Sequence, residues 1–561
     1  MRTAQRIAGI AGLAWRSEAT VSMSIQARLA AKRDAVPRDL LVVVSASVAA
    51  LAYLWWAPTS PDLAAQTARA EVVRLAGNVT WWTGWFGGLS LPSYSVLAPW
   101  WMSVVGVHAA GALAAVAGAW AGAILTRGTA RPRAGTVAFA LAGFADLLVG
   151  RVTFVVGFAI AAWALVALRA QRRALTIVAA VATYLVSPLA GLFLGIVLVA
   201  VAIADRGIRR RAAIAAGVLL AAGATTALFF PGTGVMPVRV SDMFPPAVGC
   251  VIVAALCPQR LVRTVAVLTL IAMPVFLVMP GAVGGNIARL SWVCAAPVVV
   301  ACARVPRRWL AVAVAAVAAW PISDVVQQVG WVNKPSNDAS YYSPLADALA
   351  REQAAAGAAA TGERLEVTDT VDHAASVHLI STTELARGWD RQADNADNPI
   401  FYRQGALTAT SYRDWLHGLA VGWVAVPSTS LDYAARKEAG LIRAGLPYLR
   451  LAWSNSDWKL YRVLDAAPLA TGAAVRAVTP SGITLNSTAA ASIALQVRWS
   501  AYLRVVDATT GAPVAACISN AHGWTRIYVP RAGTFTVVSP FDPAARFRQA
   551  DPACTKAAAP R

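Results

Sequence analysis

Residues 40–57 read LLVVVSASVAALAYLWWA, and after Pro58 the chain continues as TSPDLAAQTARAE to Glu71. The first stretch carries no charge over 18 residues, close to the roughly 20 residues that an α-helix needs to cross a bilayer. The second stretch is polar and brings in an acid, Asp62, directly after the apolar run. The sequence therefore predicts a membrane anchor that is followed at once by a polar loop.

The rest of the chain extends this pattern. Of its 561 residues, 58% are apolar and only 14% are charged, against about 25% charged residues in soluble domains. We predict about eleven spans, at 40–57, 109–126, 134–150, 152–168, 174–187, 189–204, 212–229, 244–257, 264–279, 290–303 and 309–321. Short spans are tolerated where they line a cavity or pack on protein. Several of the predicted spans are short. Two explanations are open: the membrane half encloses a cavity, or its helices pack as tight hairpins, as predicted around Ser187-Pro188.

Charge predicts the orientation. Residues 1–321 hold 27 Lys and Arg but 8 Asp and Glu, whereas 322–561 hold 22 and 20. The arginines of the first part cluster at every second connection, as in cytoplasmic loops. We therefore predict a multi-pass plasma-membrane protein with a cytoplasmic segment 1–39, a transmembrane domain 40–321 and extracytoplasmic domains after it. Because the charge is spaced between spans, it does not indicate nucleic-acid binding.

Three segments outside these spans also give predictions. Residues 94–107 are expected to be re-entrant or interfacial, since one more crossing would place Arg127 to Arg133 outside. Residues 322–468 alternate helical and strand patterns, typical of an α/β domain. Residues 469–561, with short strands and turns, predict a β-sandwich and tail. A disulfide between Cys517 and Cys554 is one of two readings of these outer cysteines, the other being two free thiols.

The membrane half has four acids on its predicted outer side, namely Asp62, Glu71, Asp146 and Asp242. Asp62 is our candidate general base. Asp62, Gln66 and Arg69 recur at helical spacing, so they would share one face. The alternative for Asp62 is helix capping, which does not exclude catalysis.

Two arginines at the same face are candidates for binding a phosphate, because guanidinium binds phosphate oxygens in a bidentate fork. Arg151 follows Asp146 by five residues, and Arg289 precedes a span. The alternative is that Arg151 pairs with Asp146 while Arg289 contacts lipid headgroups. The aromatic run at residues 81–86 would either stack on sugars or form an interfacial belt.

With these features the chain resembles the GT-C superfamily of membrane glycosyltransferases. The resemblance is carried by the first span and its outer loop at residues 58–93, opening with Asp62, and by the stretch 91–99, Leu-Pro-Ser-Tyr-Ser-Val-Leu-Ala-Pro. The chain is also similar to a group of actinobacterial integral membrane proteins, which share residues 91–99, 148–154, 286–290 and 386–392.

The resemblance implies transfer of a sugar from a polyprenyl-phosphate donor to a cell-envelope glycan or glycolipid, with inversion. It implies Asp62 as the base, and Glu71, Arg69, Asp146, Arg151, Arg289 and Tyr94 as residues that bind the donor. This chain has one acid where many GT-C members have a pair, which leaves open whether a divalent cation takes part; no metal ligands are predicted. Membrane lipids are the other expected partners.

Two other classes stay open. A secondary transporter would show related halves, and no repeat is visible. An inactive scaffold would bind envelope glycans through its outer domains, for example at Trp389, Asp390 and Arg391, and would tolerate Asp62→Asn.

Overall fold

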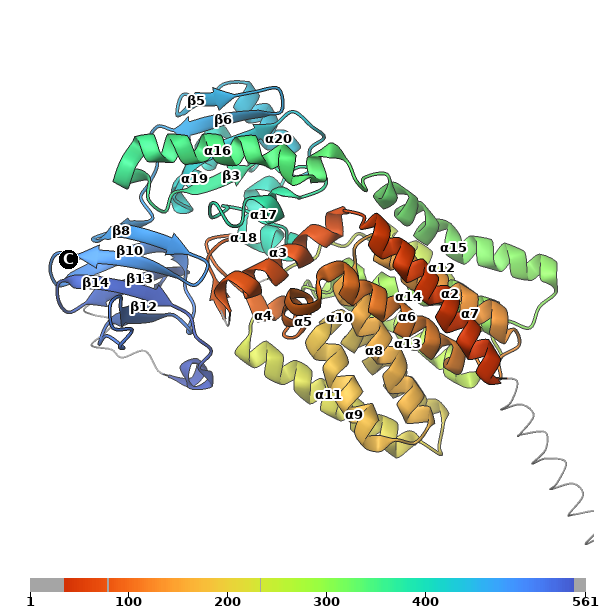
Figure 1. The fold of residues 1–561 in the computed structure, drawn as a ribbon. Helices are drawn as coiled ribbons and strands as arrows, with labels where there is room; N and C mark the ends of the chain where they lie inside the picture. Colours follow the sequence, from red (N-terminus) through yellow and green to blue (C-terminus); the bar gives the residue numbers. More distant parts are fainter. Residues whose placement is uncertain (1–34, 78–79, 233, 549–561) are drawn as a thin grey trace, which may run out of the picture.

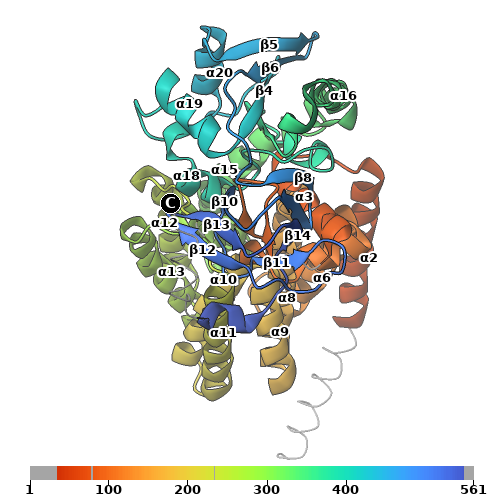
Figure 2. The same ribbon diagram turned by 90° about the vertical axis from the view of Figure 1, so that its left-hand side faces the viewer.

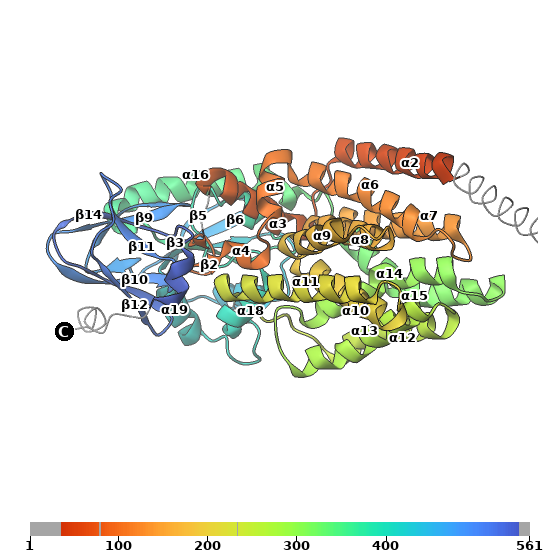
Figure 3. The same ribbon diagram turned by 90° about the horizontal axis from the view of Figure 1, so that it is seen from below.

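The computed structural model describes residues 35–77, 80–232 and 234–548. Apolar helices form one part of the molecule, and a sheet-rich part lies at one end of them (Figure 3). Most of the predicted cytoplasmic segment, residues 1–34, lies outside the described residues. The fold therefore has the predicted order, with helices first and sheets second.

Each of the eleven apolar segments forms a helix. These helices are α2 (Ala35–Trp56), α6 (Val107–Leu125), α7 (Pro132–Leu148), α8 (Val152–Arg169), α9 (Arg173–Val186), α10 (Pro188–Ala204), α11 (Arg209–Phe229), α12 (Val240–Leu256), α13 (Arg260–Val278), α14 (Arg289–Cys302) and α15 (Arg307–Val329). A short 3₁₀ turn, η1 (Gly284–Ala288), precedes α14.

Among the described residues, six helices are long and apolar enough to cross a membrane: α6, α8, α11, α13, α14 with η1, and α15. A seventh span is added if α2 and α3 (Pro61–Ala76), bent by 80°, count as one. Helices α9, α10 and α12 are apolar but shorter. The chain is therefore a multi-pass membrane protein, and the number of eleven spans stays a prediction.

The segment after the first outer loop does not span. It forms α4 (Leu91–Tyr94) and α5 (Ala98–Val105), and the eight residues of α5 extend only about 12 Å at 1.5 Å per residue. Trp100, Trp101 and Val104 on α5 are exposed. Helix α5 is therefore too short to cross a membrane by itself, and the re-entrant or interfacial placement of residues 94–107 stays a prediction.

The last helix is longer than expected. We predicted its end at residue 321, where hydropathy falls, but α15 continues through Pro321 to Val329. Its extra turns carry Asp324, whose carboxylate accepts a hydrogen bond from Arg151 at 2.9 Å. The polar extension of this helix therefore brings a carboxylate to Arg151.

The basic connections meet at one end of the helices. Arg131 donates from its backbone to the Ala301 carbonyl at 3.0 Å and from its side chain to Ala303 at 2.6 Å. Arg169 reaches the Leu125 carbonyl at 3.3 Å. At the opposite end, the Thr59 backbone N–H donates to the Asn333 side chain at 2.8 Å. This second end faces the sheet-rich part (Figure 3).

The first outer sheet has the order β3-β4-β6-β5, with β3 (Arg364–Val367) parallel to β4 (Val421–Pro427). Strands β5 (Leu449–Ser454) and β6 (Trp458–Val463) complete it in antiparallel fashion. The helices between and around the strands are α16 (Ala339–Ala356), α17 (Ala375–His378), α18 (Arg391–Asp397), α19 (Ala409–Gly418) and α20 (Arg436–Arg443). The predicted α/β alternation is present, and α17 packs against α3 (Figure 1).

The last part consists of two four-stranded sheets, with orders β12-β13-β10-β7 and β11-β14-β9-β8, and lies beside the α/β sheet (Figure 2). Its strands are β7 (Ala470–Thr471), β8 (Ala474–Thr479), β9 (Gly482–Ser487), β10 (Ala491–Arg498), β11 (Arg504–Asp507), β12 (Cys517–Ala521), β13 (Trp524–Val529) and β14 (Gly533–Val538). Cys554 lies outside the described residues, so the predicted disulfide with Cys517 stays a prediction.

Three aromatic side chains of the first outer loop are buried in the core instead of forming an interfacial belt. Trp82, Trp85 and Phe86 are at most 2% exposed and belong to the core that the loop shares with the α/β domain. A Cβ on Gly388 would lie 2.2 Å from the Trp85 ring, so only glycine fits there. The loop also forms the hairpin β1 (Trp81–Trp82) and β2 (Leu89–Ser90), which fixes the sheet-rich part to the helices.

Candidate functional site

A cavity of about 620 Å³ lies where the helices meet the α/β domain. Its walls come from α3, the region of β2 and α4, the starts of α8 and α10, α13, η1, and residues 389–393. Five of the seven predicted site residues line it: Asp62, Arg69, Tyr94, Arg151 and Arg289. Segments more than 200 residues apart in the sequence thus converge on one space.

Helix α3 supplies the polar wall. Its N-cap is Ser60 and Pro61 is its first residue, so Asp62 sits in the first turn and is not the N-cap, contrary to the alternative weighed above. Asp62, Gln66 and Arg69 all line the cavity, as their spacing predicted. The face of α3 that lines the cavity therefore carries the candidate base, Asp62.

Gln66 holds this face against the turn between α7 and α8. Its side-chain NH₂ donates to the carbonyl of Gly150, and its oxygen accepts the backbone N–H of Thr153. Gly150 has φ +85°, and a Cβ there would lie 2.2 Å from the Ser60 hydroxyl. The absence of a side chain at Gly150 lets this turn approach α3 closely enough for Asp62 to reach Arg151.

Arg151 is surrounded by three carboxylates. Its Nε lies 3.1 Å from Asp62 Oδ2, its Nη1 lies 3.1 Å from Asp146 Oδ1, and its Nη2 lies 2.9 Å from Asp324 Oδ2. The side chains of Arg151 and Asp146 are only 11% and 7% exposed, while that of Asp62 is 33% exposed. All three guanidinium nitrogens thus have a protein partner, and Asp62 is the carboxylate of the cluster that faces the cavity.

Arg289 has a different environment. Its Nη2 donates to Asn286 Oδ1 at 3.2 Å, and its guanidinium lies 5.3 Å from the centre of the Phe154 ring. Its Nε is buried and has no hydrogen-bond partner among the described residues. A buried cation with an unused donor at a cavity wall is suited to an anionic ligand.

Arg69 and Asp390 form a buried pair across the boundary between the helices and the α/β domain. Arg69 Nη2 lies 2.5 Å from Asp390 Oδ2, and the Arg69 side chain is 1% exposed. The guanidinium lies 4.1 Å from the centre of the Tyr94 ring. Both Asp390 and Tyr94 line the cavity, so this pair fixes one corner of it.

The neighbours of Asp390 complete the wall from the α/β domain. The Trp389 indole N–H donates to the Pro61 carbonyl at 2.8 Å, next to Asp62. Arg391 forms a bidentate pair with Asp432, at 2.9 and 3.0 Å. Burial alone would lower the pKa of Arg391, but Tyr402 and Asp432 together raise it, so this arginine is a fixed cation beside the cavity.

The opposite wall is apolar. It consists of side chains from α8, α10, α13 and the adjoining segments, including Phe154, Pro188, Leu189, Leu192 and Phe276. The cavity therefore has a charged wall towards the α/β domain and a hydrocarbon-like wall within the helices. Such a division suits a ligand with a polar head and an apolar tail.

Two predicted site residues do not line the cavity. Glu71 pairs with Arg74 on the exposed side of α3, because it lies off the face that Asp62 and Arg69 share. Asp146 is buried behind the wall and contacts Arg151. Asp242, the fourth outer acid, accepts a hydrogen bond from the backbone of Arg239 at the start of α12.

Asp324 was missed as a site residue, and Asp390 was named only as part of a glycan-binding surface in the scaffold alternative. The sequence offered a signal for Asp324 only in the continued helical spacing beyond the apolar run. Asp390 stands in a segment that had been singled out, at residues 386–392, but its approach to Arg69 depends on contacts across 321 positions. Among the described residues, no three His, Cys, Asp or Glu side chains are grouped as a metal site.

Comparisons with known proteins give two structural neighbours. No protein-family model matches the chain, and no curated protein matches it. The chain is similar to the solved structure of the arabinofuranosyltransferase AftD from Mycobacteria, with a TM-score of 0.42 and 14% identity over 89% of this chain and 57% of that chain. A mutant of the same enzyme gives a TM-score of 0.44 and 14% identity over 89% and 59%.

The chain thus spans less than three fifths of the length of these neighbours.

Proposed function

We propose that this chain is a glycosyltransferase that moves a sugar from a polyprenyl-phosphate donor to a cell-envelope glycan or glycolipid. The observation that carries the proposal is that one cavity holds a carboxylate, Asp62, and an incompletely paired cation, Arg289, beside an apolar wall. Those are the three groups needed to hold a lipid-linked phosphate and accept a proton.

The apolar wall accounts for the lipid. Phe154, Leu189, Leu192 and Phe276 face the cavity from helices that are apolar along their length. Burial of apolar surface favours a hydrocarbon chain by about 25 cal/mol per Å². A water-soluble nucleotide sugar would leave this wall unused, so a polyprenyl chain is the better match.

Arg289 accounts for the phosphate. Its Nε lacks a partner among the described residues, and charge-assisted hydrogen bonds contribute about 1.5–3 kcal/mol. Arg151, which the sequence also suggested for this role, already has a carboxylate at each guanidinium nitrogen. We therefore assign the phosphate to Arg289 and the positioning of Asp62 to Arg151.

The reaction is a single displacement. The acceptor hydroxyl oxygen attacks the anomeric carbon, its proton passes to the Asp62 carboxylate, and the bond from that carbon to the phosphate oxygen breaks. The phosphate leaves with the bonding electrons as polyprenyl phosphate, and Arg289 stabilises its charge. One displacement inverts the anomeric centre.

The position of the cavity fits an outer-face reaction. Arg131 and Arg169 lie at the end of the helices away from the sheet-rich part, and basic connections favour the cytoplasm. The cavity lies at the other end, against the α/β domain. The N-terminus would then be cytoplasmic, and the α/β domain and the β-sandwich would be extracytoplasmic.

The direct test is turnover of lipid-linked sugars. Proteoliposomes with wild-type protein or Asp62→Asn would be supplied with a polyprenyl-phosphate-sugar fraction and an envelope glycan extract, and the lipids followed by mass spectrometry. The wild type should convert a sugar-linked polyprenyl phosphate to the free phosphate, and Asp62→Asn should not. Identical lipid profiles in both would contradict the proposal.

A further inference from the structure

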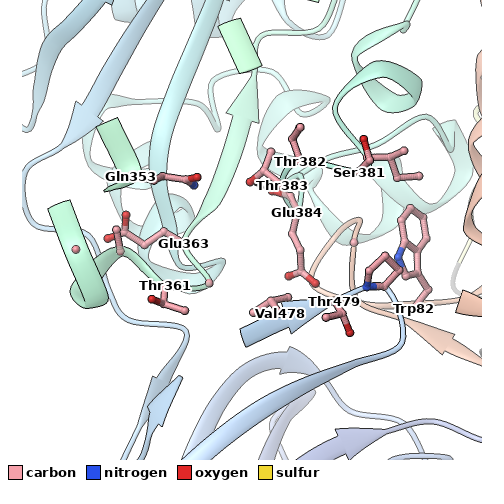
Figure 4. A pocket seen from close by; sticks show the side chains of 16 residues that line it. Trp82, Gln353, Thr361, Glu363, Ser381, Thr382, Thr383, Glu384, Val478 and Thr479 are labelled. Carbon is pink, nitrogen blue, oxygen red and sulfur yellow. Dashed lines mark hydrogen bonds between the residues drawn. The ribbon is translucent and has the colours of Figure 1, made fainter. Parts of the chain in front are cut away.

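A second cavity lies outside the one described so far. This groove, of about 320 Å³, is formed by the end of α16 and the segment leading to β3, by residues 380–384, by the turn after β8, and by the first outer loop. Figure 4 shows its side chains converging from the α/β domain and the β-sandwich. Its volume is at the lower end of the roughly 300–1,000 Å³ typical of ligand pockets.

The two carboxylates of the groove are already neutralised. Glu363 Oε1 accepts from Arg462 at 2.8 Å. Glu384 Oε1 accepts from the Thr83 hydroxyl at 2.6 Å, and its other oxygen lies 3.2 Å from Arg364 Nε. Because each acid has its own arginine, the groove offers no uncompensated charge to a metal ion or an anion.

The remaining polar lining is neutral. It consists of hydroxyl groups and one amide, contributed by Gln353, Thr361, Ser381, Thr382, Thr383 and Thr479. The Thr382 hydroxyl donates to the Leu379 carbonyl at 2.8 Å, and its oxygen keeps lone pairs for a ligand donor. Neutral groups that both donate and accept hydrogen bonds match the hydroxyls of a sugar.

Strand β1 contributes a side chain to the groove and a side chain to the first cavity. Trp81 lines the first cavity and Trp82 lines the groove, because successive side chains of β1 point to opposite sides. Residues of the β1–β2 hairpin thus line both spaces. A chain of sugars that passes over this hairpin would reach both spaces.

We infer that the groove binds a neutral oligosaccharide. If the proposed transfer is correct, this ligand is the part of the acceptor glycan remote from the reacting hydroxyl. Binding itself rests only on the groove and does not require Asp62.

The test measures binding to the full-length protein in detergent. Maltohexaose, xylohexaose and arabinohexaose would be titrated by saturation-transfer NMR, with an oligogalacturonate as the charged comparison. Ser381, which is exposed, is changed to Trp to fill the groove from its rim. Thr382→Val removes a lining hydroxyl with little change of shape. Thr410→Val, at an exposed position of α19 outside the groove, is the matched control.

We expect at least one neutral hexasaccharide to bind the wild type and Thr410→Val, and to bind Ser381→Trp and Thr382→Val at least tenfold more weakly. The oligogalacturonate should not compete. Failure of all three to bind, or binding that Ser381→Trp leaves unchanged, would overturn the inference. Hexasaccharide binding is measured without turnover and Asp62-dependent turnover without the hexasaccharides, so the groove and the transfer reaction can fail separately.

Discussion

Arg151 and Asp62 lie 89 positions apart and form an ion pair in which Arg151 Nε is 3.1 Å from Asp62 Oδ2. The contact joins the turn between α7 and α8 to the first turn of α3. It orients the one carboxylate of the three-acid cluster that opens to the cavity. In the proposed reaction Asp62 is the base, and Arg151 is the residue that positions it.

The first prediction concerns Asp62. Asp62→Asn keeps the shape of the side chain but cannot accept the hydroxyl proton, so turnover should fall by about 10²- to 10⁴-fold. Single-turnover kinetics with the lipid-linked donor would measure it. Glu71→Gln, on the exposed side of the same helix, should keep wild-type turnover. Equal loss of turnover in both variants would show that the reaction depends on the negative charge of α3 and not on a base at Asp62.

The second prediction concerns the Arg151 cluster. Arg151→Met leaves Asp62, Asp146 and Asp324 without their common cation, and breaking a buried pair costs on the order of 3–5 kcal/mol. The Tm in detergent should fall accordingly. Arg74→Met removes an exposed partner of Glu71 and should cost less than about 1 kcal/mol. If Arg151→Met and Arg74→Met have the same Tm, the Arg151 cluster does not stabilise the fold.

The third prediction concerns Trp85. This side chain is fully buried between the first outer loop and the α/β domain, so Trp85→Ala should destabilise the protein by about 3–5 kcal/mol. Chemical denaturation followed by tryptophan fluorescence would measure the change. Trp55→Ala, at a 90% exposed position on α2, is the control and should have little effect. An unaltered transition in Trp85→Ala would contradict its place in the core.

The fourth prediction is a dependence of stability on pH. Glu438 is buried beside Glu366; Tyr412 donates to it at 2.8 Å and Arg387 at 3.3 Å. Burial raises the pKa of Glu438 to about 7. Between about pH 4.5 and pH 7 the Glu438 carboxyl is protonated in the folded state but ionised in the unfolded state. The free energy of unfolding should therefore fall as the pH rises through this interval. The slope cannot exceed about 1.4 kcal/mol per pH unit for one group.

Melting curves between pH 5 and pH 7.5 would measure this effect in the full chain. Glu438→Gln cannot titrate, so its Tm should fall less over the same interval. Parallel curves for wild type and Glu438→Gln would mean that this carboxyl does not carry the dependence.

The helices could be predicted because each apolar run ends at a charge or a turn residue. The start of α8 at Val152 and the end of α10 at Ala204 match the predicted spans at those ends. The end of α15 could not be found by hydropathy, because Asp324 is held by a partner far away in sequence.

The site could be predicted only in part. The spacing of Asp62 and Arg69 places them on one face, and their position after a span places that face at a membrane boundary. What no local pattern shows is which charges are paired. Arg151 and Arg289 look alike in sequence, yet one has three acids around it and the other has an unused donor. That difference arises from packing and decides their roles.

We propose that the cavity holds a polyprenyl phosphate through Arg289. Native mass spectrometry of protein purified in mild detergent from a host that makes polyprenyl phosphates tests it most directly, with Arg289→Ala compared against Arg74→Ala. We expect a bound polyprenyl phosphate, or its sugar adduct, in the wild type and in Arg74→Ala, and its loss in Arg289→Ala. Retention of bulk phospholipid alone, equally in all three proteins, would contradict it.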